Sequence, residues 1–302
     1  MRVFLTGATG WVGSAIAPEL LAAGHQVLGL ARNDAGAEKL AGLGVEAHRG
    51  ELTDTGSLVA GCRACDGVIH TAFIHDFSQF EVNVETDRLA VEAMAGALEG
   101  SGKPFVITSG TMMVQQGRPA TEQDAPPSVA VPRAASEARM LAASARGVRG
   151  SIVRLSPTVH GAGDHGFVPR LIAIAREKGV SPYVGDGSNR WPAVHRLDAA
   201  HLYRLALETA APGSRLHGVA EEGVPFRAIA EAIGQGLGVP VRSLTPEEAP
   251  AHFGFLAAFV AVDNPTSSAL TRGSLGWAPR QPDLLPDLRD AGYFALSPKP
   301  AT

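Results

Sequence analysis

The sequence of 302 residues has little net charge, few cysteines and tyrosines, and no long hydrophobic run. Its formal net charge of −4 includes no block of lysine or arginine, which argues against nucleic acid as a partner. No apolar run reaches the length of a membrane span and no signal peptide precedes the first predicted strand, so we expect a cytoplasmic protein without a membrane partner. With 45% hydrophobic and 19% charged residues, the composition is typical of a globular protein with a sizeable core.

The only two cysteines, Cys62 and Cys65, have the spacing of a redox or metal pair. They follow a helical pattern, however, and the dipole at a helix C-terminus disfavours thiolates. Two thiols cannot close a zinc site alone, and His160, Asp164 and His165 lack the spacing of paired ligands. We therefore expect two structural thiols and no metal site.

Three glycines, Gly7, Gly10 and Gly13, stand between a short apolar run at residues 3–6 and a helical pattern at 11–23. Glycine permits a tight turn, lets the backbone approach a pyrophosphate, and lets the helix pack closely on the strand. The free N–H groups of the helix start would then face the phosphates. This context predicts a dinucleotide-binding turn.

The residue after the second predicted strand, at 26–31, indicates which dinucleotide is bound. A fold that selects NAD normally places an acid here to bind the ribose hydroxyls, whereas this chain has Arg32 and Asn33, and its first acid is Asp34. A guanidinium pairs with a 2′-phosphate. We therefore predict NADPH as the cofactor.

Strand and helix patterns alternate through the first half of the chain, which predicts an α/β fold with a Rossmann-type, doubly wound parallel sheet. The later segments, including a polar loop expected at 186–195, are too few for a second large sheet and predict a small C-terminal substrate-binding lid domain. We place the NADP-binding domain at residues 1–157 plus about 191–220, and the substrate-binding domain at about 158–190 and 221–302.

These motifs resemble those of the extended branch of the short-chain dehydrogenase/reductase superfamily, the epimerase, dihydroflavonol-reductase and steroid-dehydrogenase-like group. The resemblance runs through segments 6–13, 50–54, 70–73, 108–111, 154–161, 190–198 and 275–279. It implies a homodimer formed through helices at 81–99 and 133–146. The cofactor-binding residues it implies are Gly7, Thr9, Gly10, Trp11, Val12, Gly13, Arg32, Asn33, Glu51, Leu52, Thr71, Ala72, Phe73, Thr108, Pro157, Thr158 and Val159.

One departure from the family pattern concerns the proton donor, a tyrosine with a lysine four residues further on. The tyrosines of this chain are Tyr183, Tyr203 and Tyr293, and none has a lysine at that distance. By register, the two positions hold Arg133 and Glu137. Because carbonyl reduction needs a proton for the developing alkoxide, this departure weakens the usual route.

Three functions remain open. An imine substrate would arrive as a protonated iminium, which Glu137 would favour if its carboxylate faces the pocket rather than pairing with Arg133. A ketone or aldehyde would need another donor: His75, His160, or Ser109 or Thr111 through water. A sensor would bind NADPH without turnover. We favour NADPH-dependent reduction of a small cyclic or aromatic C=N bond.

The substrate, a small molecule, is expected to lie among residues at the carboxyl ends of the strands and in the lid. The predicted pocket residues are Met112, Met113, Arg133, Phe167, Arg190, Trp191 and His195.

Overall fold

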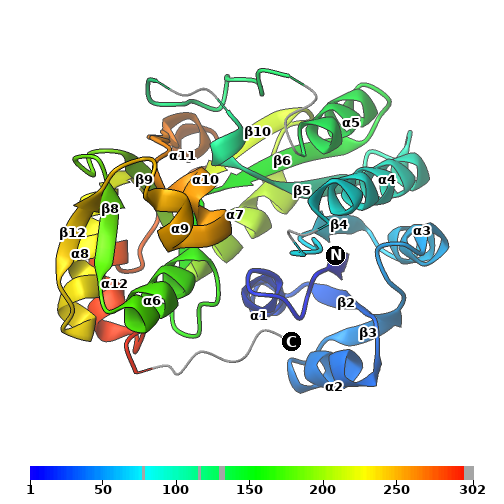
Figure 1. Ribbon diagram of the computed structural model, residues 1–302. Helices are drawn as coiled ribbons and strands as arrows, with labels where there is room; N and C mark the ends of the chain where they lie inside the picture. The colour runs from blue at the N-terminus through cyan, green and yellow to red at the C-terminus, as the bar shows by residue number, and fades with distance from the viewer. Residues whose placement is uncertain (77–78, 115–116, 129–132, 296–302) are drawn as a thin grey trace.

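The computed structural model of the chain describes residues 1–76, 79–114, 117–128 and 133–295. It has a large lobe built on a parallel sheet and a smaller lobe built mainly from the second half of the chain (Figure 1). The predicted α/β class and doubly wound parallel sheet are confirmed.

The central sheet has seven strands in the order β10-β6-β5-β4-β1-β2-β3, and every neighbouring pair is parallel. The direction of strand addition reverses between β1 and β4, which is where sheets of this type bind their ligands. The strands are β1 (Arg2–Thr6), β2 (Gln26–Ala31), β3 (Glu46–Arg49), β4 (Gly67–His70), β5 (Pro104–Gly110), β6 (Arg149–Leu155) and β10 (Ser214–Gly218).

Helices cover both faces of this sheet, so alternate strand residues enter two separate cores. Val3 and Leu5 pack with α1 and α7, whereas Phe4 packs with α3, α4 and α5. Cys62 and Cys65 are buried in the second core as free thiols, as expected of structural cysteines. The helices of this lobe are α1 (Gly13–Ala22), α2 (Asp34–Gly42), α3 (Thr55–Arg63), α4 (Phe80–Leu98), α5 (Ala134–Ser144) and α7 (Arg196–Thr209).

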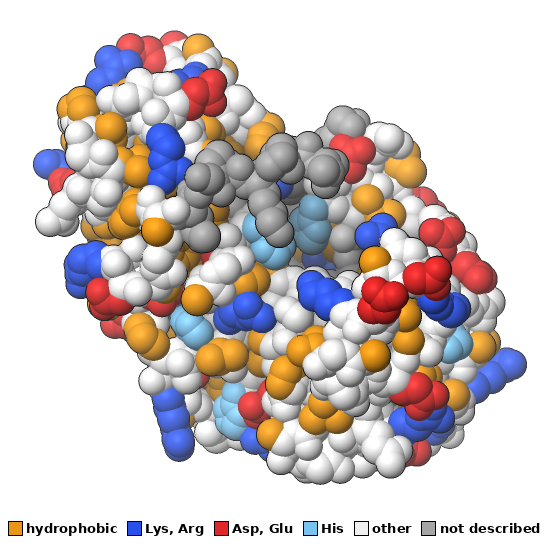
Figure 2. Space-filling view, turned by 90° about the horizontal axis from the view of Figure 1, so that it is seen from below, with side chains coloured by type: hydrophobic (Ala, Val, Ile, Leu, Met, Phe, Trp, Pro, Cys, Tyr) orange, Lys and Arg blue, Asp and Glu red, His pale blue; other side chains and the backbone are white. Residues whose placement is uncertain are grey.

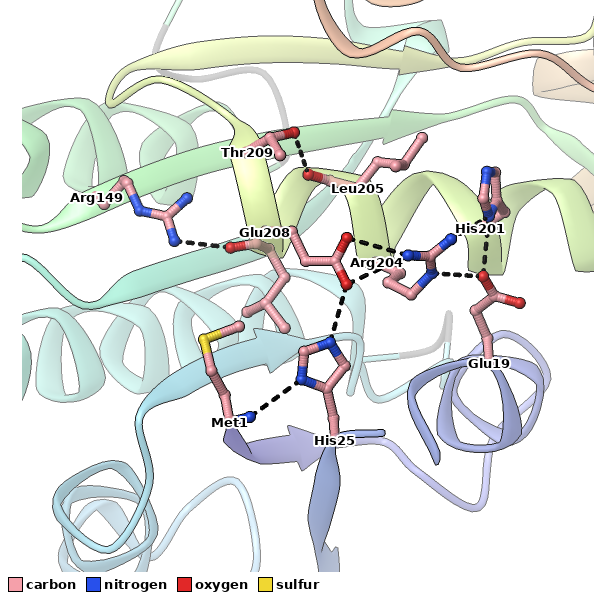
Figure 3. Close-up of polar contacts among 10 residues, drawn as sticks. Met1, Glu19, His25, Arg149, His201, Arg204, Leu205, Glu208 and Thr209 are labelled. Atoms are coloured by element: carbon pink, nitrogen blue, oxygen red, sulfur yellow. Dashed lines mark hydrogen bonds and ion pairs between the residues drawn. The ribbon is translucent and has the colours of Figure 1, made fainter. Parts of the chain in front are cut away.

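Polar contacts fasten α7 to α1 and to the start of the chain (Figure 3). Glu19 of α1 accepts a hydrogen bond from Arg204 at 2.7 Å and lies 2.8 Å from His201. Glu208 lies 3.0 Å from Arg204 and 2.9 Å from the ring of His25. A helix that begins at residue 196 is thus held against the first helix of the fold, and the chain crosses between the lobes just before it.

The smaller lobe has its own hydrophobic core and two small sheets, ordered β11-β9-β7 and β12-β8. The polar loop expected at 186–195 is wrong, because residues 190–195 form β9, which pairs on both sides and buries Trp191, Ala193 and Val194. A strand buried in this way shows no polar alternation. The remaining elements of the smaller lobe are β7 (Thr158–His160), β8 (Ser181–Val184), β9 (Arg190–His195), β11 (Glu221–Pro225), β12 (Val241–Leu244), α6 (Phe167–Lys178), α8 (Phe226–Leu237), α9 (Ala249–Phe253), α10 (Ala257–Val260), α12 (Leu284–Asp290) and the 3₁₀ turn η3 (Gly254–Leu256). The 3₁₀ turn η2 (Thr111–Met113) follows β5, and α11 (Ala269–Leu275) packs against β10 and α7 of the large lobe.

Within the described part of the chain, every helix is too short or too polar to span a bilayer.

Candidate functional site

The glycine turn between β1 and α1 has the geometry of a phosphate cradle. Gly7 has φ 73°, and a Cβ there would lie 2.7 Å from the amide nitrogen of Ala72. A Cβ on Gly13 would lie 2.1 Å from the carbonyl oxygen of Gly7. Val12, the N-cap residue of α1, supplies no side-chain cap. The amides of Gly10 and Ser14 already donate to backbone carbonyl groups, so an anion would be bound by the amides that lie between them. The turn therefore fits the pyrophosphate of a dinucleotide.

Basic side chains gather beside this turn at the end of β2. Arg32 is exposed, and Lys39 donates a hydrogen bond from Nζ to the carbonyl oxygen of Thr9 at 2.8 Å. The carboxylate of Asp34 is paired with Arg49, which neutralises the first acid after the strand. The binding of a 2′-phosphate at this position stays a prediction.

Three further residues expected on the adenine side lie close to the ends of β2 and β3. Asn33 caps α2, because its Oδ1 accepts a hydrogen bond from the amide of Gly36 at 2.9 Å. Glu51 is exposed and accepts a hydrogen bond from Thr53 at 2.9 Å. Leu52 is partly buried against the core beneath α3, α4 and α5. These positions stay predictions as nucleotide contacts.

A buried polar chain leads from β1 to the start of α5. His70 Nδ1 lies 2.6 Å from Thr6 Oγ1, and its Nε2 lies 3.3 Å from Asp87 Oδ1. Ser136 donates a hydrogen bond to Asp87 Oδ2 at 2.6 Å, and Arg133 lies 3.4 Å from Oδ1. Burial raises the pKa of Asp87, but Arg133, His70 and Ser136 outweigh it and lower the pKa to about 2. The carboxylate of Asp87 is therefore ionised, and it pairs with the guanidinium of Arg133.

Arg133 is held in a strained and specific position. Among the described residues it is the one non-glycine residue with positive φ, at 64°. Its Nη2 donates a hydrogen bond to the carbonyl oxygen of Thr108 at 2.6 Å, and its guanidinium carbon lies 4.6 Å from the ring centroid of Phe73. The side chain is 16% exposed, and its Nε is buried without a partner. Backbone strain combined with an unsatisfied buried donor is typical of a functional residue.

Glu137 is bound in the opposite direction, away from Arg133. Arg154 donates two hydrogen bonds to its carboxylate, from Nε at 2.9 Å and from Nη2 at 2.6 Å. Ser109 donates a third to the same carboxylate at 2.6 Å, and all three side chains are buried. The alternative Arg133–Glu137 ion pair is therefore wrong: each residue has found a different partner, Asp87 for Arg133 and Arg154 for Glu137.

The hydroxyl groups at the end of β5 are committed to internal bonds. Thr111 Oγ1 donates to Asn264 Oδ1 at 2.9 Å, and Asn264 returns a bond to the Thr111 carbonyl oxygen at 3.1 Å. Thr108 Oγ1 donates to the carbonyl oxygen of His70 at 2.8 Å and lies 2.7 Å from the hydroxyl of Tyr203. Burial raises the pKa of Tyr203, which makes it a poor acid despite its place near the site. The catalytic roles of Ser109 and Thr111 stay predictions.

His75 stands apart because it is exposed beside this network. Its ring centroid lies 5.2 Å from that of Phe73, the ring over which Arg133 is stacked. Surrounding protein, followed by the charge of Arg133, lowers the pKa of His75, so its imidazole is neutral at neutral pH. Thr71, in the same segment, donates a hydrogen bond to the carbonyl oxygen of Thr6 at 2.8 Å and holds the loop against β1. Of the predicted proton donors, His75 is the one open to solvent.

The segment after β6 connects the glycine turn to the smaller lobe. Trp11 Nε1 donates a hydrogen bond to the carbonyl oxygen of Val159 at 2.8 Å. His160 is buried, and its Nδ1 lies 2.7 Å from Asp287. Burial lowers the pKa of His160 even though Asp287 acts in the other direction. Pro157 is partly buried and Thr158 is buried, with its hydroxyl oxygen lacking a partner.

The predicted pocket residues of the smaller lobe differ in how they are placed. Phe167 is partly buried, with its ring centroid 5.9 Å from that of Trp191. Trp191 is fully buried and packs beside the ring of Phe167. Arg190 is bound to Asp263 at 2.8 Å, and His195 accepts a hydrogen bond from the amide of Leu197 at 3.2 Å. Met112 and Met113 are partly buried just beyond β5.

Asp164 is a buried acid in the loop between β7 and α6. The hydroxyl of Tyr293 donates a hydrogen bond to its Oδ2 at 3.0 Å and accepts one from the amide of Gly161 at 2.9 Å. Burial, which outweighs these bonds, raises the pKa of Asp164 to about 6. The loop is therefore fastened to the C-terminal segment through the hydroxyl of Tyr293, which bonds both Asp164 and Gly161.

Sequence reasoning missed Asp87, Arg154 and Asn264. Two of them carry a visible signal: Asp87 falls on the buried face of α4 with Asn83, and Arg154 interrupts the apolar run of β6. A charged residue on a face that must be buried indicates a buried partner. Asn264 carries no such signal, because it lies outside any regular element and reaches Thr111 across 153 residues.

Comparisons with known proteins agree with this geometry. Residues 3–217 match the model of the NAD dependent epimerase/dehydratase family. An uncharacterized protein of Schizosaccharomyces pombe is 50% identical over 97% of this chain and 100% of its own length. The 2-alkyl-3-oxoalkanoate reductase of Stenotrophomonas maltophilia is 32% identical over 80% of this chain and 77% of its own. The structure of Thermus thermophilus UDP-glucose 4-epimerase in complex with NAD shares the fold, with a TM-score of 0.73 at 21% identity, covering 98% of this chain and 99% of that one.

The matched residues span the glycine turn, the buried polar chain and the strands of the central sheet. The chain therefore belongs to the NAD-dependent epimerase/dehydratase family, within the short-chain dehydrogenase/reductase type of nicotinamide-dependent enzymes.

Proposed function

We propose that the protein is an NADPH-dependent reductase of a neutral carbonyl group, and that Arg133 donates the hydrogen bond that stabilises the oxygen. The observation that carries this proposal is the guanidinium of Arg133, which stands where the resemblance places the family's tyrosine. The Nη2 group of Arg133 donates hydrogen bonds to Thr108 and Asp87, while its Nε is buried without a partner. A fixed cation at this point favours negative charge that develops on an oxygen.

The charges around Arg133 favour a carbonyl over the iminium expected from the sequence. An iminium carries a positive charge, which the guanidinium of Arg133 repels. Glu137 was the group expected to stabilise that charge, but its carboxylate is bound by Arg154 and Ser109. A carbonyl group instead gains negative charge as it is reduced, and Arg133 stabilises this change.

NADPH, when bound, supplies the hydride. The glycine turn would hold its pyrophosphate, and Arg32, Lys39 and Arg49 support a 2′-phosphate at the end of β2. Arg133 remains charged throughout, because a guanidinium does not release its proton at neutral pH. The proton that the reduced oxygen needs then comes from solvent, with exposed His75 as the group that passes it on.

The test is oxidation of NADPH, with NADH as the control, against matched pairs of ketones and cyclic imines. We expect ketones to be preferred, and Arg133→Met to lower kcat by about a hundredfold to a thousandfold, as loss of an oxyanion donor does. Arg139→Met is the matched control, because Arg139 lies on α5, the helix that Arg133 precedes, with an exposed side chain 3.9 Å from Glu92. Preference for imines, or an Arg133→Met enzyme with normal kcat, would contradict the proposal. Tight NADPH binding without oxidation of any substrate would indicate a sensor.

A further inference from the structure

Arg196 follows β9 of the smaller lobe directly and reaches the glycine turn of the large lobe. Its guanidinium carbon lies 4.0 Å from the ring centroid of Trp11, and its Nη2 donates a hydrogen bond to Ser14 Oγ at 3.1 Å. Ser14 in turn donates to the carbonyl oxygen of Trp11 at 3.3 Å. The guanidinium is therefore fixed beside the first turn of α1, next to the amides that the turn offers to a pyrophosphate.

The side chain of Arg196 is held at both its stem and its head. A Cβ on Gly161 would lie 3.0 Å from Cγ of Arg196 and 3.1 Å from its Cδ, so the loop after β7 covers the aliphatic stem. Trp11, against which the guanidinium stacks, is anchored by the hydrogen bond from its Nε1 to the carbonyl oxygen of Val159 at 2.8 Å. A cation that is already positioned in this way loses little conformational entropy when it binds a ligand.

Arg196 is partly buried, yet it forms no ion pair with any residue that the structure describes, and its Nε is buried without a partner. Burial lowers the pKa of Arg196, and the charge of Asp164 opposes this shift without forming an ion pair. Arg204 on the same helix is different, because it pairs with both Glu19 and Glu208 (Figure 3). A cation that is partly desolvated and has no counter-ion favours the binding of an anion.

We propose that Arg196 binds the pyrophosphate of the dinucleotide, together with the amides that lie between Gly10 and Ser14. The forked donors of a guanidinium match the oxygens of a phosphate group. Figure 2 shows histidine and arginine or lysine side chains together in the hollow between the two lobes, a charge that suits an anionic ligand. The inference applies to either nicotinamide dinucleotide, and it does not depend on which group the enzyme reduces.

The test is a fluorescence titration of the full chain with NADPH and with NADH. Because both dinucleotides contain the same pyrophosphate, we expect Arg196→Met to weaken the binding of both by about tenfold to a hundredfold, as loss of a charged hydrogen bond does. Arg196→Lys should recover part of the loss, since lysine keeps the charge but not the forked donors. Arg204→Met is the control, because Arg204 holds the same helix against α1 through Glu19 at 2.7 Å, and this variant should bind both dinucleotides as the wild type does.

Two fragments of the cofactor separate a phosphate contact from a general loosening of the turn. The first, 2′-phospho-ADP-ribose, contains the pyrophosphate, whereas adenosine 2′-monophosphate lacks it, and the dissociation constant of each is measured by displacement of bound NADPH. We expect Arg196→Met to weaken the binding of the first fragment and to leave that of the second unchanged. Equal weakening of both fragments, unchanged binding of the first, or a wild type that binds neither dinucleotide would overturn the inference. No substrate is used, so binding that depends on Arg196 without oxidation of any carbonyl compound would support this contact while the reductase proposal fails.

Discussion

Glu137 is either a structural residue that neutralises Arg154 or a catalytic residue that contacts the cofactor or substrate. The variant Glu137→Gln distinguishes these two roles. The carboxylate accepts three hydrogen bonds, two from Arg154 and one from Ser109, and Arg154 is fully buried. Glutamine keeps the shape but removes the charge. The guanidinium of Arg154 would then be buried without a counter-ion, although it keeps its bond to the carbonyl oxygen of Asp124 at 2.8 Å.

Breaking a buried ion pair from one side costs about 3–5 kcal/mol. Because folded proteins are stable by only about 5–15 kcal/mol, this loss should be plain in urea unfolding of the cofactor-free protein. The matched control is Glu231→Gln, which removes an exposed ion pair with Arg227 at 2.8 Å on α8. An exposed pair of this spacing contributes about 0.3–0.5 kcal/mol. The contrast between the two variants measures the effect of burial.

The same variant should leave the dissociation constant of NADPH within about threefold of the wild type at temperatures where it is folded, because the carboxylate faces Arg154. This is measured by titrating the fluorescence of bound NADPH. If Glu137→Gln instead keeps wild-type stability and binds NADPH tenfold or more weakly, the carboxylate must contact the nicotinamide ribose, and the structural interpretation of Glu137 is refuted.

Three further predictions follow from the turn, the loop before α6 and the cysteines. Gly13→Ala should abolish NADPH binding in the same titration, because its Cβ would lie 2.1 Å from the carbonyl oxygen of Gly7, whereas Gly42→Ala, which meets nothing within 4 Å, should bind normally. The raised pKa of Asp164 means that the folded protein binds the proton of this carboxyl group more tightly than the unfolded chain does, so the stabilising effect of protonation is full below about pH 4 and is lost as the pH rises through about 6. Relative to Asp164→Asn, the wild type should lose roughly 3 kcal/mol of unfolding free energy across that range. Equal pH profiles of the two proteins would contradict this prediction. Burial raises the pKa of Cys62 to about 12 and that of Cys65 to about 11, so iodoacetamide should label neither thiol in the folded protein at pH 8 and both after unfolding in urea; rapid labelling of the folded protein would show that a thiol is reactive.

The fold could be predicted closely where local chemistry determines it. The strand predicted at 26–31 has the observed bounds of β2, because a strand covered on both faces must be apolar throughout. The glycine turn could be predicted as well, since positive φ at Gly7 and the close approach at Gly13 allow no other residue. In the smaller lobe the same rule misled, because β9 begins with the partly exposed Arg190 and buries Pro192 and His195, so that its sequence resembles a loop.

Which residues make up the site could be predicted from the sequence, but which of them pair with one another could not. Arg133 and Glu137 are one helical turn apart, a spacing that favours an ion pair on an isolated helix. Packing reverses this preference: α4 brings Asp87 to Arg133, and β6 brings Arg154 to Glu137. Both partners come from other elements of the sheet and its helices, so the choice depends on tertiary contacts that local patterns do not contain.

The two departures from the family's pattern act together rather than singly. Where the resemblance expects a neutral proton donor followed by a cation one turn later, this chain has a cation followed by an acid that Arg154 neutralises. The positive charge has thus moved from the later position to the earlier one, at Arg133, where Asp87 and Thr108 hold the guanidinium in place. A tyrosine can give up a proton, whereas a guanidinium can only stabilise charge. Such a site loses its internal acid and retains electrostatic stabilisation, which suits reduction of a carbonyl whose proton can be taken from solvent through His75.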